Sequence, residues 1–179
     1  VVACSTTLLA TILGTLAALG ISRRQFPFKS AAMAILISPM IVPVVVTAVG
    51  VYIFYADLGL ANTRIGLILA HTALATPFVV ITVTATLSGY ARTLPRAAAS
   101  LGAAPLTTFG RVTLPMIRPG IVSGALFAFG TSFDEVVVAL FLVRAEQRTL
   151  PMQMFSGIRE QINPTIMAAA SILIVVSVA

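Results

Sequence analysis

The chain alternates between long apolar runs and short polar links. Five runs reach or approach the roughly 20 helical residues that cross a hydrocarbon layer of about 30 Å. They cover Val1 to Ile21, Ala31 to Tyr55, Ile65 to Leu87, Pro119 to Val143 and Pro164 to Ala179. The last run is cut short by the end of the chain. This pattern predicts an all-α integral membrane protein in which residues 1–179 form a single transmembrane domain.

Prolines and glycines mark special positions within these runs. Pro39 and Pro43 lie in the second run and Pro77 in the third. Transmembrane helices tolerate such prolines as kinks or breaks when their neighbours satisfy the freed backbone groups. We therefore expect kinked packing at these positions. Gly120 and Gly124 have the four-residue spacing that permits two membrane helices to approach closely.

Composition and charge exclude a soluble domain and a nucleic-acid-binding domain. Apolar residues make up 59% of the chain and charged residues 9%, against about 25% charged in soluble domains. The net charge of +6 comes from basic residues in the links between apolar runs, not on one helix face. If the links alternate sides, the first and third share seven basic residues and the other two share four. The positive-inside rule then predicts that loops 22–30 and 88–118 are cytoplasmic.

Residues for catalysis are scarce. Cys4 and His71 are each the only residue of their type, which excludes an intrachain disulfide and a metal site that needs two of either. We expect both to pack as ordinary residues. Lys29 is the only lysine and belongs to no glycine-rich phosphate-binding loop. We therefore expect no enzyme activity and no bound cofactor. The chain begins and ends inside apolar runs without an initiating Met, which indicates a fragment.

The link over 88–118 is the longest stretch that is not apolar, and it contains arginines but no acid. Its sequence predicts a short helix through Leu101, a left-handed turn residue at Gly102, and a second short helix over 105–112. We expect the proline at 115 to stop this second helix. An exposed element of this kind, with an alanine surface edged by arginines, is suited to docking into a groove of another protein.

The same link resembles the EAA loop of bacterial ABC importer permeases. That pattern is Glu-Ala-Ala, three residues, Gly, and a later Leu-Pro. The matching positions here are Arg96, Ala97, Ala98, Gly102, Ala103, Leu114 and Pro115. Arg96 stands where the family has its Glu, which puts in doubt any salt bridge that the usual acid makes. The resemblance implies that the loop forms the coupling helices that seat in an ATPase subunit.

Further segments extend the resemblance over essentially the whole chain, toward the second permease subunit of the spermidine/putrescine class. These segments are 38–43, 71–78, 132–138 and 149–151. The resemblance implies a type I, methionine-importer-like helical bundle with five of six spans visible, in the bacterial inner membrane. It also implies cytoplasmic ATPase subunits, a second permease subunit and a periplasmic substrate-binding protein as partners.

Asp134 and Glu135 are the most costly residues of the sequence, because apolar residues flank them for more than two helical turns on either side. Acids within a membrane span are functional by default. One hypothesis is that one or both line a pathway and attract a cationic polyamine. Alternatively, the helix breaks near Gly130 to Ser132 and leaves the acids in water near the periplasmic end, or one acid pairs with an arginine or caps a helix.

The function predicted from the resemblance is that of a transmembrane permease subunit of an ATP-driven importer for a small solute, spermidine or putrescine. The same architecture could import another solute, such as iron, thiamine or an opine, because the coupling loop carries no substrate information. An ion-driven secondary transporter or channel is a less favoured alternative, since it needs no coupling loop and more often shows inverted repeats.

Overall fold

The computed structural model describes residues 1–22, 28–89, 93–144 and 148–160, together with 167, 168, 171, 172 and 175. The regular elements of these residues are all helical, which confirms the predicted fold class. They are α1 (Val2–Ile21), α2 (Lys29–Ile41), α3 (Val44–Asp57), α4 (Arg64–Ser88), α5 (Thr93–Ser100), α6 (Pro105–Thr108), the π-helical turn η1 (Phe109–Thr113), α7 (Leu114–Asp134), α8 (Val137–Leu142) and α9 (Leu150–Glu160). Most of the predicted run 164–179, and Arg23 and Arg24, lie outside the described residues.

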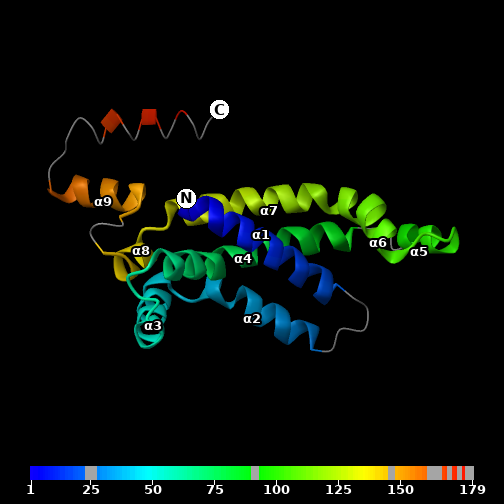
Figure 1. The fold of residues 1–179 in the computed structure, drawn as a ribbon, viewed down its shortest axis with the longest axis horizontal. Helices are drawn as coiled ribbons and strands as arrows, with labels where there is room; N and C mark the ends of the chain where they lie inside the picture. The colour runs from blue at the N-terminus through cyan, green and yellow to red at the C-terminus, as the bar shows by residue number, and fades with distance from the viewer. Residues whose placement is uncertain are drawn as a thin grey trace.

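A core of three long helices runs through the molecule. α4 packs against both α1 and α7, which also contact each other (Figure 1). One cluster of buried apolar residues joins the three helices, made of Ala10, Ala18, Ala75, Val79, Val83, Ile117 and Ala128. Large apolar side chains such as Leu8, Leu16 and Leu126 point outward and stay exposed. This arrangement, with small residues at the contacts and large apolar residues outside, is typical of helices that pack within lipid.

Glycines allow the closest contacts in this core. A Cβ added to Gly124 would lie 2.9 Å from the Cα of Val79, and one added to Gly120 would lie 2.9 Å from the carbonyl oxygen of Thr82. Gly14 of α1 approaches the same residue of α4, where an added Cβ would lie 2.7 Å from the Cβ of Val79. The close contact that the spacing of Gly120 and Gly124 permits is therefore present, between α7 and α4.

The second predicted run is a bent pair of helices. α2 and α3 meet at an angle of 103° across a break between Ile41 and Val44. Val42 is extended (φ −71°, ψ 132°), as expected for a residue that precedes a proline. Pro43 has no N–H to donate and begins the next helix as its N-cap. The break is the one that the sequence allowed for, although Pro39 and Pro77 remain inside helices.

Three described helices are long and apolar enough to cross a membrane, and a fourth is added if the bent pair counts as one span. Their directions place the connections at two opposite ends of the molecule. α1 and α4 end toward the side where α5 and α6 lie, whereas α3, α8 and the end of α7 lie at the other side (Figure 1). The end of α1, the start of α2 and the end of α4 therefore lie toward one end of the molecule, together with α5 and α6.

Candidate docking element and carboxylate site

The turn after α5 is set by a glycine. Gly102 has a positive φ of 81°. Its N–H donates to the carbonyl of Ala99 (3.0 Å), and the N–H of Ala103 donates to the carbonyl of Ala98 (3.0 Å). These two bonds form a Schellman motif, which satisfies carbonyls that the helix end would leave free. The left-handed turn predicted at Gly102 is confirmed.

The element made of α5 and α6 projects from one end of the three-helix core (Figure 1). None of the residues of α5 is buried. Arg96 and Ala97 are exposed, and Leu101 and Leu106 expose 88% and 82% of their surface. Leucines exposed to this extent, one in the turn after α5 and one in α6, offer apolar surface that a second protein can cover.

The structure corrects the prediction that Leu114 and Pro115 stop the second helix of this element. α6, η1 and α7 form one continuous helix, Pro105–Asp134, of 30 residues. In the π-helical turn the N–H of Leu114 donates to the carbonyl of Phe109, five residues back. Such a wider turn leaves room for the ring of Pro115 and replaces a bond that proline cannot donate. The docking element is therefore continuous with α7.

The structure also corrects the placement of the two acids within a fourth span over 119–143. α7 ends at Asp134, Glu135 is extended (φ −73°, ψ 108°), and α8 begins at Val137. A carboxylate oxygen of Glu135 accepts the N–H of Val138 (3.0 Å), which caps α8. Asp134 is exposed. The acids therefore lie at a break between two helices. This break is at Glu135, three to five residues after the segment 130–132, where a break was considered from the sequence.

Asp134 and Glu135 thus have different surroundings. Glu135 is half-buried and has a backbone partner, as the capping alternative expected. Within the described part of the chain, Asp134 has neither a hydrogen bond nor an ion pair. Phe133, its neighbour in sequence, stacks on Phe129 with ring centroids 5.7 Å apart. An exposed carboxylate without a partner attracts cations by its charge.

A buried histidine lies beside this break. It is packed, as expected from the sequence, but it also makes a hydrogen bond that the sequence did not predict. His71 of α4 exposes 1% of its surface. Its Nδ1 lies 3.0 Å from Oγ of Ser132 on α7, in a buried hydrogen bond. Its Nε2 has no partner among the described residues. The sequence predicted ordinary packing for His71, and nothing in it pointed to a partner 61 positions away.

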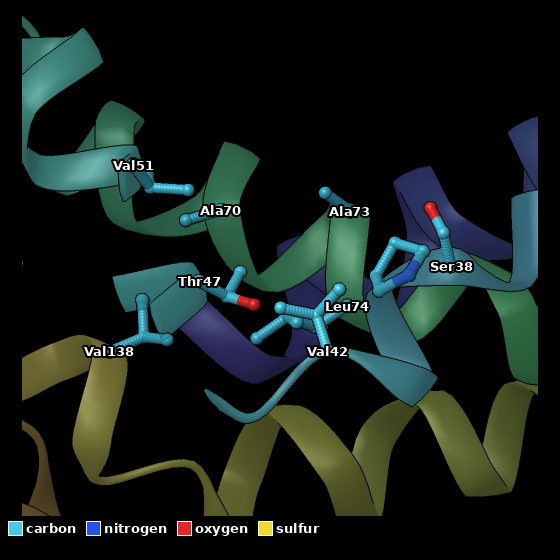
Figure 2. A pocket seen from close by; sticks show the side chains of 9 residues that line it. Ser38, Val42, Thr47, Val51, Ala70, Ala73, Leu74 and Val138 are labelled. Atoms are coloured by element: carbon cyan, nitrogen blue, oxygen red, sulfur yellow. The ribbon is translucent and has the colours of Figure 1, made fainter. Parts of the chain in front are cut away.

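Two cavities lie near the end that holds the break. One, of about 230 Å³, occupies the bend between α2 and α3 against α4 and α8; Figure 2 shows its lining side chains, among them Thr47, Leu74 and Val138. The other, of about 350 Å³, includes Arg64, Arg148 and Ser132 in its lining. Neither cavity is lined by Asp134 or Glu135. The described residues contain no cluster of potential metal ligands.

Comparison with known proteins gives consistent matches over nearly the whole chain. Residues 10–179 match the family described as binding-protein-dependent transport system inner membrane component. The spermidine/putrescine transport system permease protein PotC of Haemophilus influenzae is 34% identical over 96% of this chain and 66% of its own length. The putrescine transport system permease protein PotI of Escherichia coli is 34% identical over 97% of this chain and 64% of its own length.

A more distant relative has another solute in its name. The molybdenum transport system permease protein ModB of Mycobacterium bovis is 31% identical over 97% of this chain and 71% of its own length. The chain spans slightly less than two thirds of the length of PotC and PotI.

Proposed function

The chain belongs to the family of binding-protein-dependent transport system inner membrane components, and we propose that it is a permease subunit of an ATP-driven importer of polyamines such as spermidine or putrescine. Residues 1–179 form its single transmembrane permease domain, and 88–118 form its cytoplasmic coupling loop. The similarity to PotC and PotI, whose names give spermidine and putrescine as their solutes, supports the substrate class. The exposed carboxylate of Asp134 supports a cationic substrate.

The proposed partners follow from the family and from the exposed element. Cytoplasmic ATPase subunits cover the surface that contains Arg96, Leu101 and Leu106, a second permease subunit completes the pathway, and a periplasmic binding protein delivers the solute. The loops 22–30 and 88–118 lie on the cytoplasmic side. This assignment is supported by the end of the molecule that the described helix ends beside these loops share, and by the seven basic residues in the loops.

The continuous helix Pro105–Asp134 supports a mechanical link between energy input and substrate. It spans about 45 Å at 1.5 Å per residue, with the docking element at one end and Asp134 at the other. A shift of the docking element by a bound ATPase subunit moves the end of this helix without an intervening loop. ATP binding then biases two arrangements of the bundle, as an alternating transporter requires.

Chemical cross-linking tests the docking surface. Cys4, the native cysteine, is first replaced by alanine, and a single cysteine is introduced at Leu106 in the assembled transporter. We expect a bifunctional thiol reagent to join this cysteine to the ATPase subunit. A cysteine at Leu126, exposed to 68% on the side of α7, is the matched control and remains unjoined. Equal cross-linking from both positions would contradict the docking assignment.

Uptake kinetics test the carboxylate. In the complete transporter, Asp134→Asn removes the charge while keeping the shape, and we expect the apparent KM for putrescine to rise about 10-fold or more, since an ion pair with a partly desolvated ammonium is lost. Asp57→Asn, the same exchange at the end of α3, is the control and leaves KM within about 2-fold. An unchanged KM in Asp134→Asn removes Asp134 from the pathway.

A second candidate is the import of an oxyanion. The resemblance to ModB and the pair Arg64 and Arg148 lining one cavity favour it. The two candidates differ in which variant loses transport. An oxyanion importer is impaired by Arg64→Gln or Arg148→Gln and not by Asp134→Asn, and its binding protein takes molybdate in place of putrescine.

A further inference from the structure

The hydrogen bond between His71 and Ser132 is an unusual feature of an otherwise apolar contact. Along α7, the residues that face α4 include Gly120, Gly124, Ala128 and Ser132, each four positions from the next and all buried. The first three have a hydrogen atom or a methyl group as side chain, which offers little to prevent α7 from rotating against α4. Among the described residues, the bond from His71 to Ser132 is the side-chain hydrogen bond that joins α4 to α7. It therefore restricts rotation of α7 about its axis where small residues alone do not.

The position of Ser132 places this restriction at the end of α7. Ser132 and Asp134 are two residues apart, about 200° around the helix. With Ser132 held against α4, Asp134 is directed away from α4 and is exposed. On the other side of the break, Glu135 caps α8 through Val138. The last turn of α7 is thus fixed on both sides, and Asp134 is the acid that keeps its carboxylate free of partners within the described residues.

We propose that His71 is a positioning residue for substrate recognition, which acts by holding Ser132 and thereby sets the direction in which Asp134 meets the cation. This inference rests on the proposed role of Asp134. His71 itself does not touch the substrate, because it is 1% exposed. A histidine buried at such a contact costs free energy unless its polar atoms are used, and the bond to Ser132 is the use that the structure shows.

Variants at position 71 can be chosen so that each reproduces one of the two ring nitrogens or neither. Asparagine at 71 places an amide atom near the position of Nδ1 and can keep the bond to Ser132. Glutamine places its amide near the position of Nε2, which has no partner among the described residues, and loses that bond. Leucine fills the volume and offers no polar atom. Ser132→Ala removes the bond from the other side, and Ser123→Ala, on the exposed side of α7, is its matched control.

The test measures the apparent KM and maximal rate of putrescine uptake by the complete transporter, at equal amounts of assembled complex. We expect three variants to raise KM about 10-fold while the maximal rate changes by less than about 2-fold: His71→Leu, His71→Gln and Ser132→Ala. A change in KM of about 10-fold is the size expected when one interaction between neighbouring residues is lost. His71→Asn and Ser123→Ala stay within about 2-fold of the wild type. Ser132→Ala remains informative if His71→Leu fails to assemble.

Double variants separate this proposal from the proposed function. In the Asp134→Asn background, His71→Leu and Ser132→Ala are expected to add less than about 2-fold to KM, because the group that they position is gone. Multiplicative effects, or an Asn variant as impaired as Leu, would overturn the positioning role and leave the role of Asp134 intact. If Asp134→Asn alone leaves KM unchanged, the proposed role of Asp134 is wrong, and the positioning role of His71, which depends on it, is wrong as well.

Discussion

Gly124→Ala is expected to destabilise the contact between α4 and α7, and the structure sets the size of the effect. The added Cβ would lie 2.9 Å from Cα of Val79 and 2.5 Å from Oγ1 of Thr82. The hydroxyl of Thr82 can rotate away, but the Cα of Val79 is backbone and moves only with α4. An ordinary carbon contact needs about 3.5 to 4.0 Å, so the helices must separate locally by about 0.6 to 1.1 Å.

Overpacking of this kind costs about 1–3 kcal/mol, a factor of about 5 to 150 in the unfolding equilibrium. Unfolding of the complete protein in mixed micelles, titrated with denaturing detergent, measures the difference. Gly130→Ala is the matched control, because it makes the same exchange in the same helix where an added Cβ meets nothing within 4 Å. The control should be neutral or slightly stabilising. Equal stability of the two variants would refute the close-contact reasoning.

Two further variants test the helix ends. Gly102→Ala places a side chain on a residue in the left-handed region at φ 81°, which costs about 1 kcal/mol. If 88–118 is the coupling loop, we expect substrate-loaded binding protein to stimulate ATP hydrolysis less in this variant. Gly110→Ala, with open space around the glycine, is the control and leaves the stimulation unchanged. Glu135→Ala removes the cap of Val138 and should cost about 0.5–2 kcal/mol in the same unfolding titration, whereas Glu135→Gln keeps an accepting oxygen and most of the stability. If Gln were as damaging as Ala, the charge and not the cap would matter.

Some features of the fold could be predicted from the sequence because they depend on local chemistry. The apolar runs locate α1 and α4 to within a residue or two, since hydrocarbon thickness fixes span length. Pro43 marks the bend of the second run because proline constrains its predecessor and lacks an N–H. Gly102 marks the turn after α5 because few other residues adopt a positive φ without cost.

Other features depend on contacts that a local pattern does not contain. Pro115 looked like a stop, but a π-helical turn before it accommodates the ring. The valines at 136 to 138 continue the apolar run past Asp134, so hydropathy gave no indication that the helix ends there. The capping role of Glu135 and the bond between His71 and Ser132 arise only once α4, α7 and α8 are in place.

The unbroken helix from Pro105 to Asp134 also fixes an angular relationship. Each residue of an α-helix advances the chain by about 100°, so one residue inserted between the docking element and Asp134 would turn the carboxylate through more than a quarter of a circle relative to that element. The length of this segment is therefore constrained in a way that the length of a loop is not. The π-helical turn Phe109–Thr113 has the geometry of a single inserted residue. Deleting one residue there should remove the wider turn that accommodates Pro115 and change the direction in which Asp134 points.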